Sequence, residues 1–399
     1  MCNKPIRLAW LATHPIQYQA PLLCAIAKCP DIDLKALFFS DFSTREFIDP
    51  GFGRAITWDT PLLEGYQYEF LPGTGTASKI KSIKTFQPRV GGFAKRLNLD
   101  NFDAVLVQGW NHYGMLKAAW LAKRAGLKVL MRCEATDHVD SSKGPKKVIR
   151  EMTVRFLLSQ IDNCLAIGTR NRSFYLKRGF PAERIGNMPY CVDNDHFRRK
   201  AADADVLGLR EELGLELKRP VILYASKFMA RKFPDRLLAA YLQLPEPRPY
   251  LVYVGDGDLR ASLEDTVKKN QLKDVRFAGF RNQGELPAFY ALADIFVLPS
   301  INETWGLVIN EAMNAGCAIV TTDQVGSAAD LVYDNKNGFV IPARDVPALV
   351  SALLNCLSEE RFREMGAKSI EIIHGWGINE NVMGLRQVLG LPDKYEVLL

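Results

Sequence analysis

Short apolar runs alternate with amphipathic stretches along the chain. In the first half the runs are IRLAWLA (6–12), DLKALFF (33–39), DAVLVQG (103–109), LKVLMRC (127–133) and NCLAIG (163–168). Each run has the length of a buried strand, and stretches with helical periodicity, such as MLKAAWLAKRAG, stand between them. Alternation of this kind is typical of βαβ units, in which strands pair in parallel and helices cover the sheet. This half therefore predicts a mostly parallel sheet.

A second series of runs follows a polar segment at 187–214, so we place a domain boundary there. The first domain is expected over residues 1–197 and the second over 198–375. The later runs are PVILYASK, PYLVYVGDG, VRFAGF, ADIFVLPS, GCAIVTTD and GFVIPA. The fold class predicted is α/β, with two Rossmann-like, doubly wound sheets in tandem. Ligands of such sheets bind at the carboxyl ends of the strands, so we expect the site in a cleft there.

The net charge of +6 hides an asymmetry between the two halves. Residues 1–200 contain 30 Lys and Arg against 18 Asp and Glu, a net charge of +12, which leaves −6 for the rest. Cations cluster at 79–84, 143–150 and 170–178. They follow no nucleic-acid recognition pattern, so nucleic acid is not an expected partner. We expect peripheral contact with an anionic membrane surface, and a merely solvated basic face is the alternative.

Two further features concern the compartment. No stretch reaches the ~18 consecutive apolar residues of a membrane-spanning helix, and His14 and Pro15 interrupt the first apolar run, so export is not expected. The eight cysteines include no CxxC pair, which predicts neither a structural metal site nor a disulfide framework. We expect a cytoplasmic protein, on the inner face of the membrane if it binds one.

The segment ETWGLVINE carries the strongest chemical signal. It follows the strand-like run ADIFVLPS, and a helix is expected to begin near Gly306 and Leu307. Backbone amides at a helix N-terminus bind anions, and a glycine lets a phosphate approach closely. If the helix included both Glu303 and Glu311, the two carboxylates would lie about 80° apart around it and line one ligand. The alternative is that Glu303 caps the helix and Glu311 is an ordinary helical residue.

These residues resemble the signature of the retaining family 4 glycosyltransferases of the GT-B fold, in which two Glu are separated by seven residues. The segments ASKFMARKF, VYVGDGDLR, VRFAGFRNQGELPAFYALADIFVLPS, VGSAADLVYDNKNGFVIPARD and PYCVDNDHF are similar to other parts of that family. The resemblance covers about 200 residues specifically. HPIQY also resembles transferases of bacterial surface-polysaccharide synthesis.

The resemblance implies a GT-B architecture in which residues 376–399 form a helix that returns to the first domain. The implied activity transfers a sugar from a nucleoside diphosphate to an acceptor hydroxyl with retention of configuration. Surface polysaccharide or glycolipid assembly is the expected setting, and a lipid-linked sugar pyrophosphate or a saccharide is the expected acceptor. No cofactor and no metal are expected, because cations and a helix N-terminus stabilise the leaving diphosphate.

The implied roles fall on matching positions. Glu303 would bind donor sugar hydroxyls, Glu311 the ribose, and Lys227 with Lys232 the diphosphate. Lys227 stands where the family more often has Arg, and Phe233 replaces a Gly, so the phosphate geometry is an open point. Further donor-site candidates are Thr304, Trp305, Gly306, Leu307, Gly255, Phe280 and Arg281.

Candidates in the first domain follow strand-like runs. His14 is the catalytic candidate, with Gln17 and Tyr18 beside it, and a structural turn is the alternative for this segment. The remaining acceptor-side candidates are His112, Arg132, Glu134 and His138, although an ion pair between Arg132 and Glu134 is equally compatible with the sequence.

Three other functions fit parts of the chain. The glycines of VGDGD suggest a dinucleotide-dependent oxidoreductase, but the first βαβ unit lacks the GxGxxG turn of that class. Asp256 and Asp258 have the form of a metal-binding pair, which would indicate a metal-dependent transferase. A non-catalytic nucleotide-sugar-binding protein would keep the second-domain site without the transfer chemistry.

Overall fold

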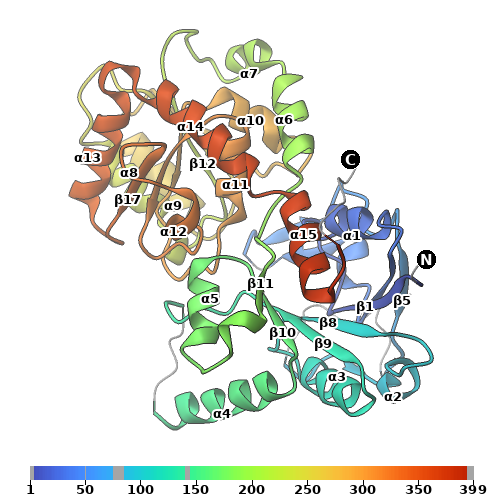
Figure 1. Cartoon of the computed structure of the whole chain (residues 1–399). Coiled ribbons are helices and arrows are strands. Elements are labelled where there is room, and N and C mark those ends of the chain that lie inside the picture. Colours follow the sequence, from blue (N-terminus) through green and yellow to red (C-terminus); the bar gives the residue numbers. More distant parts are fainter. Residues whose placement is uncertain (1–3, 50, 75–84, 140–143, 393–399) are drawn as a thin grey trace. The chain divides into compact units, whose positions relative to one another are not determined.

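The computed structural model describes residues 4–49, 51–74, 85–139 and 144–392 (Figure 1). The chain forms two compact units. Unit 1 comprises Met1–Phe47, Thr60–Tyr190 and Ile378–Leu399, and unit 2 comprises Ile48–Asp59 and Cys191–Gly377. The boundaries drawn from the sequence assigned residues 48–59, 191–197 and 376–377 to the first domain, whereas in the structure these residues belong to unit 2.

Unit 1 is built on a seven-stranded sheet in which all neighbouring strands are parallel. The spatial order is β11-β10-β9-β8-β1-β2-β5. The chain moves outward from β1 through β2 to β5 and then returns to β8 on the other side of β1. The strands are β1 (Ile6–Ala12), β2 (Ile32–Phe38), β5 (Gln67–Phe70), β8 (Ala104–Gln108), β9 (Lys128–Arg132), β10 (Asn163–Ala166) and β11 (Ile185–Asn187).

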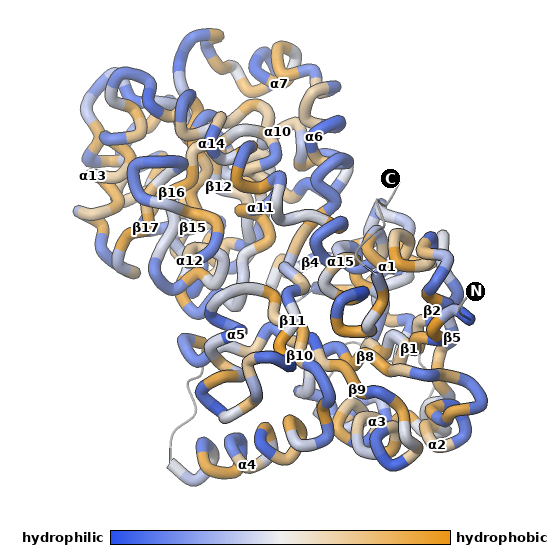
Figure 2. Tube along the Cα trace, viewed as in Figure 1, coloured by the Kyte–Doolittle hydropathy of each residue, from blue (hydrophilic) through white to orange (hydrophobic). Residues whose placement is uncertain are grey.

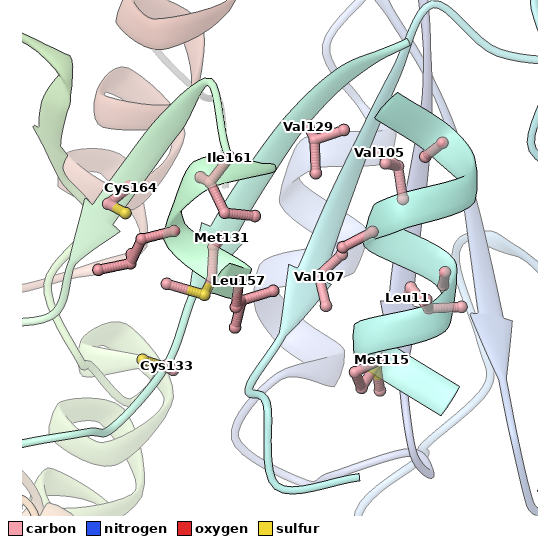
Figure 3. Packing of buried hydrophobic residues seen from close by; sticks show 14 of the residues in the cluster. Leu11, Val105, Val107, Met115, Val129, Met131, Cys133, Leu157, Ile161 and Cys164 are labelled. Carbon is pink, nitrogen blue, oxygen red and sulfur yellow. The ribbon is translucent and has the colours of Figure 1, made fainter. Parts of the chain in front are cut away.

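Helices cover both faces of this sheet. On one face, buried side chains from four helices form a single cluster with those of β8 and β9, and Figure 3 shows Met115 and Leu157 among them. On the other face, the first and last helices of the unit pack against each other. The helices are α1 (Ala20–Ala27), α2 (Phe93–Arg96), α3 (Tyr113–Arg124), α4 (Pro145–Ser159), α5 (Thr169–Leu176) and α15 (Ile378–Leu389). A short ladder joins β6 (Gly73–Thr74) to β7 (Arg89–Val90).

Unit 2 contains a six-stranded parallel sheet in the order β14-β13-β12-β15-β16-β17. Figure 2 shows the strands of both units as largely hydrophobic, as expected when helices cover both faces. The strands are β12 (Val221–Ala225), β13 (Tyr250–Val254), β14 (Val275–Gly279), β15 (Ile295–Leu298), β16 (Ala318–Thr322) and β17 (Gly338–Ile341). The helices are α6 (Asn194–Ala202), α7 (Val206–Glu212), α8 (Pro234–Tyr241), α9 (Arg260–Lys269), α10 (Leu286–Leu292), α11 (Leu307–Asn314), α12 (Ala328–Leu331), α13 (Val346–Leu357) and α14 (Phe362–His374). The strands β3 (Phe47–Asp49) and β4 (Arg54–Ile56) pair as a separate hairpin.

The strand order reverses at one position in each sheet. In unit 1 the reversal lies between β1 and β8, and in unit 2 it lies between β12 and β15. Loops that leave such a pair of strands diverge to opposite faces, which opens a crevice at the carboxyl edge where ligands of these folds bind. The loops after β12 and β15 carry the two Lys and the first Glu of the predicted donor site. His14, Gln17 and Tyr18 follow β1.

The predicted architecture is confirmed: two parallel α/β sheets, with the C-terminal helix α15 in unit 1. All eleven strands expected from apolar runs are present. Of the strands in the two large sheets, the sequence did not predict β5 and β11. The residues of β5 are exposed or half-buried at a sheet edge, and β11 has only three residues, so neither forms an apolar run.

Close contact holds α15 on unit 1. A Cβ added to Gly384 would stand 1.6 Å from the carbonyl oxygen of Asn187 in β11, so only glycine permits this approach. The Arg386 Nη1 atom lies 2.6 Å from the Asp31 Oδ1 atom, and the Arg386 side chain is almost completely buried. Asn381 accepts a hydrogen bond from Arg132 at 3.2 Å. Backbone fit and buried charge together fix this helix in place.

The first prediction concerns this contact. Gly384→Ala should lower the free energy of unfolding of unit 1 by about 1–3 kcal/mol, because the new methyl group overlaps a backbone oxygen. Intrinsic helix propensity alone would give the opposite sign, by roughly 1 kcal/mol. Calorimetric unfolding measures the effect, and Met383→Ala on the exposed side of the same helix is the matched control. An unchanged or raised unfolding temperature for Gly384→Ala would contradict the close contact.

Candidate active site

Three cations follow β12 at the reversal point of the unit 2 sheet. Lys227 stands two residues after the strand, and Arg231 and Lys232 belong to a short 3₁₀ turn at Ala230–Lys232. The side chain of Lys232 is buried, whereas that of Arg231 is exposed. Positive charge therefore extends from the surface into the interior at the end of this strand.

Glu303 brings a carboxylate to these cations from the loop after β15. Its Oε2 atom accepts a hydrogen bond from Lys232 and lies 3.2 Å from the Arg231 Nη1 atom. Burial lowers the pKa of Lys232 from its ordinary value, while the adjacent Glu303 carboxylate acts in the opposite direction. Glu303 thus offsets part of the cost of burying the Lys232 ammonium, because an isolated buried charge would be strongly disfavoured.

The helix α11 begins directly after this loop. Gly306 is its N-cap residue, with a φ of 93°, and no side chain caps the helix. The alternative in which Glu303 caps the helix is therefore wrong, since its carboxylate is directed to Lys232 and Arg231 instead. The first amides of α11, including that of Leu307, consequently have no side-chain cap to accept their hydrogen bonds. This is the arrangement that favours an anion at a helix N-terminus.

Two predicted donor-site side chains are buried. Glu311 is completely buried in α11 and accepts a hydrogen bond from the Tyr290 hydroxyl at 2.5 Å. It is therefore not an ordinary exposed helical residue, and its ribose role stays a prediction. Trp305 is also buried and donates its indole N–H to Asn310 at 2.9 Å, so its side chain supports the loop, while Thr304 beside it is half-buried.

The glycine-rich turn after β13 packs against the cation segment. Gly255 has a φ of 135°, and a Cβ there would stand 2.1 Å from the carbonyl oxygen of Ser226. The Phe228 N–H donates to the Asp256 carbonyl at 2.8 Å. These contacts hold the backbone between β12 and Lys227 in place. Gly255 therefore acts through backbone packing in this structure.

The β3–β4 hairpin covers two of the predicted donor residues. Lys227 donates to both carboxylate oxygens of Asp49, at 2.7 and 2.8 Å, and its Nζ atom lies 4.8 Å from the centre of the Phe52 ring. The Phe280 ring contacts Phe52 edge-to-face, with the ring centres 4.9 Å apart, and the Arg54 guanidinium lies 4.9 Å from the Phe280 ring centre. The Asp49 carboxylate thus forms an ion pair with Lys227, the residue that the sequence predicted to bind the diphosphate.

The same hairpin continues onto the loop after β14. Asn282 donates to the Thr57 carbonyl at 2.8 Å, and the Gly284 N–H donates to Asp59 at 2.9 Å. Arg281 pairs with Glu285 at 3.0 Å within this loop. The predicted donor-site residues Phe280 and Arg281 therefore lie in a segment that contacts the hairpin.

In unit 1, His14 lies in the turn between β1 and α1. Its Nδ1 atom is 2.9 Å from the Thr13 hydroxyl, and its ring packs edge-to-face on Phe42. Burial lowers the pKa of His14 to about 4, so the imidazole is neutral at pH 7 and offers hydrogen bonds rather than charge. Gln17 and Tyr18 are half-buried in the same turn.

The other acceptor-side candidates have varied surroundings. His112 is buried and accepts the Gly114 N–H at 3.0 Å as the cap of α3. Arg132 is buried and donates to the carbonyls of Met188 and Pro189. Glu134 is exposed and accepts a hydrogen bond from a tyrosine, Tyr190, at 2.6 Å. His138 is half-buried after β9. His112 and Arg132 thus have structural partners within unit 1.

Sequence reasoning missed two residues of the unit 2 site. Arg231 stands next to Lys232 in ASKFMARKF, and the third cation of that motif was the available signal. Asp49 had no local signal, because it reaches Lys227 from 178 positions away. Among the residues that the structure describes, no helix has the length and apolarity needed to cross a membrane.

Comparisons with known proteins agree with this geometry. The family model for glycosyl transferases group 1 matches residues 208–371. An alpha-D-kanosaminyltransferase from Streptomyces kanamyceticus is 31% identical over 196 residues, or 48% of this chain and 50% of that protein. A GDP-mannose-dependent alpha-(1-6)-phosphatidylinositol monomannoside mannosyltransferase from Mycobacterium tuberculosis is 30% identical over 267 residues, or 63% of this chain and 68% of that protein. The matches thus span half of the first relative and about two thirds of the second.

Solved structures share the fold at lower identity. HepE from Anabaena in complex with UDP has a TM-score of 0.72 at 18% identity, covering 96% of this chain and 100% of that one. Sucrose-phosphate synthase from Thermosynechococcus elongatus has a TM-score of 0.69 at 19% identity, covering 96% and 98%. These solved structures show the shared fold, and the mycobacterial relative, 30% identical over 68% of its length, shows the family. The chain belongs to the group 1 glycosyltransferases, family 4 of the GT-B fold.

Proposed function

We propose that the chain transfers a sugar from a nucleoside diphosphate to an acceptor hydroxyl with retention of anomeric configuration. The observation that carries the proposal is the group formed by Lys227, Arg231, Lys232, Glu303 and the N-terminus of α11 at the reversal point of the unit 2 sheet. Cations, an uncapped helix N-terminus and one carboxylate suit a ligand that combines a diphosphate with sugar hydroxyls.

The cations act on the leaving group. Cleavage of the bond between the anomeric carbon and the phosphate oxygen builds negative charge on the departing diphosphate. Fixed positive groups stabilise this charge as it develops, without the reorganisation that water would need. Lys232 is already held in place by Glu303, and the α11 amides are held by the helix. The site therefore favours the transition state over the bound donor.

Retention follows from attack on the face that the leaving group vacates. The acceptor oxygen forms a bond to the anomeric carbon as the bond to the phosphate oxygen breaks, and the acceptor proton passes to that phosphate oxygen. Glu303 binds hydroxyls of the donor sugar and orients the anomeric carbon. Its carboxylate accepts hydrogen bonds from Lys232 and Arg231, and carboxylate oxygens can accept further hydrogen bonds from sugar hydroxyls.

The activities of two similar proteins support the setting. The mycobacterial relative is a GDP-mannose-dependent transferase that acts on a phosphatidylinositol monomannoside, and HepE was crystallised with UDP and with UDP-glucose. We propose a nucleotide-sugar donor and a saccharide or lipid-linked acceptor for this chain as well. The competing function is a non-catalytic nucleotide-sugar-binding protein, which would bind donors from a nucleotide-sugar panel without hydrolysing or transferring any of them.

The second prediction tests Glu303. Glu303→Gln should lower kcat for donor turnover by about 100-fold or more, because the contact to the sugar is lost in the transition state. Binding of the free nucleoside diphosphate should persist. Calorimetric titration and a donor-hydrolysis assay separate the two effects. The control is Glu264→Gln, which removes an exposed pairing with Arg260 on α9. Near-normal turnover of Glu303→Gln would refute the assignment.

The third prediction is metal-independent activity. The three cations and the α11 N-terminus supply the positive charge that a divalent ion would otherwise bring. Asp256 already accepts hydrogen bonds from Arg260 at 3.2 Å and from the Gly257 N–H. Donor turnover should therefore survive dialysis against EDTA. Loss of turnover that Mg²⁺ or Mn²⁺ restores would instead place Asp256 and Asp258 at the reaction centre.

The fourth prediction concerns the hairpin. A diphosphate that binds Lys227 must displace the Asp49 carboxylate, so Asp49→Asn should tighten nucleoside diphosphate binding. The gain should be about threefold to tenfold, since both side chains are partly exposed and the ion pair is screened. Asp59→Asn, on the same hairpin and bonded only to the Gly284 amide in the contacts described above, is the matched control. Weaker binding by Asp49→Asn would show that Asp49 supports the donor.

A further inference from the structure

The helix α4 is apolar on two opposite sides. Its inner side places Val154, Leu157 and Leu158 in the hydrophobic cluster of unit 1. Its outer side exposes Val148, Ile149, Met152 and Phe156, which retain 59, 65, 66 and 53% of their accessible surface. At ~100° per residue these four lie within an arc of about 100°, opposite the buried side. Figure 2 shows hydrophobic residues recurring along the helix.

A surface helix normally has one apolar stripe, which faces the core, and polar residues on the opposite side. Four large side chains on one arc form a continuous strip, unlike the single exposed apolar residues that are common on protein surfaces. Core packing does not explain them, because Val154, Leu157 and Leu158 already supply it. The outer side of α4 therefore has the form of a contact surface.

The neighbouring helix α3 extends this surface with aromatic and basic residues. Tyr113, Lys117, Trp120 and Arg124 are exposed and fall on one narrow stripe, opposite the buried alanines of the helix. The Arg124 guanidinium lies 4.9 Å from the Trp120 ring centre. The two helices contact each other, and both pack their inner sides on the same cluster, so their outer sides face away from the sheet together (Figure 1).

The charge of this surface has one sign. Within Tyr113–Arg124 there is no Asp or Glu, and within Pro145–Ser159 the one carboxylate is Glu151. Glu151 accepts a hydrogen bond from Arg178 at 2.6 Å, so its charge is compensated. Lys147 and Arg155 are exposed on α4 beside the apolar strip. The surface thus combines apolar side chains, Tyr and Trp, and cations that form no ion pair with the residues that the structure describes.

We propose that this α3–α4 face (Tyr113, Lys117, Trp120, Arg124, Val148, Ile149, Met152 and Phe156) binds the surface of an anionic lipid bilayer. The apolar strip enters the boundary between headgroups and acyl chains, as in helices that lie in the membrane plane. Tyr113 and Trp120 lie at headgroup level, where amphipathic rings are enriched. The cations pair with anionic headgroups, which supplies the second signal that stable attachment requires.

Charge favours a bilayer over a second copy of the chain. A twofold interface sets the same surface against itself, so Lys117, Arg124 and Arg155 would meet their own copies without carboxylates to pair with. An anionic bilayer instead complements every one of these charges. The inference does not depend on glycosyl transfer. Of the cation clusters named in the sequence analysis, the one at 143–150 overlaps the start of α4, and residues 79–84 lie outside the described part of the chain.

The test is flotation of the full chain with vesicles of phosphatidylcholine alone or mixed with phosphatidylglycerol. We expect binding to the anionic vesicles that weakens as salt is raised. The variant Ile149→Ser/Met152→Ser/Phe156→Ser should reduce this binding at least about tenfold, even at low salt. Lys117→Gln/Arg124→Gln should bind less at low salt and depend less on salt. Leu207→Ser/Leu217→Ser, which changes equally exposed side chains in unit 2, should bind as the unmodified chain does.

Two control measurements show whether the Ser variants still fold. Their thermal unfolding and their binding of nucleoside diphosphate should both be unchanged. The single variant Ile149→Asp tests the apolar strip with one change. Equal binding to neutral and anionic vesicles, or full binding by the triple Ser variant, would overturn the proposal. So would a dimer in sedimentation equilibrium that the triple variant abolishes, since the face would then join two copies. No donor is present in these assays, so a failure of the proposed transfer activity would leave them unaffected.

Discussion

Parallel strands cannot be joined by a tight hairpin, and this constraint shapes both units. Each parallel pair needs a crossover, and the crossovers supply the helices that cover the two sheets. Because all strands of a sheet point the same way, the loops after them meet at one edge. The reversal of strand order between β12 and β15 then separates two of these loops onto opposite faces. Lys232 and Glu303, 71 positions apart, meet there as a consequence of topology.

The ion pairs at this edge have different physical consequences. Lys232 and Glu303 are both largely buried, and the Glu303 carboxylate favours the charged form of Lys232, so removing Glu303 would leave a buried ammonium without this partner. Lys227 and Asp49 are more exposed, and Asp49 lies on a hairpin attached through loops rather than through the sheet. The first pair is therefore a fixed part of the site, whereas the second can exchange its carboxylate for another anion at modest cost.

The sequence predicted those parts of the structure that depend on local pattern. Strands such as β12 and β13 are completely buried, so they appear as uninterrupted apolar runs, and the loop with Glu303 carries its own motif. The edge strand β5 has no such run, because half of its residues are exposed. Asp49 could not be found, since only the fold brings its hairpin to Lys227. The exposed apolar strip of α4 could not be predicted either. The sequence shows the apolar residues of this helix, but only packing against the sheet decides which of them are buried.

Because α15 belongs to unit 1 but follows unit 2 in the sequence, unit 1 cannot finish folding until unit 2 has been synthesised. Unit 1 is assembled from three stretches of chain, and nearly all of unit 2 lies between the second and the third. A ribosome therefore releases unit 2 before α15 exists, so unit 2 is free to fold first, as domains made of contiguous chain do. Until α15 arrives, Arg132 lacks Asn381, Asp31 lacks Arg386, and the apolar surface over β11 faces solvent. The first unit therefore keeps this surface and these polar partners uncovered until α15 has been synthesised.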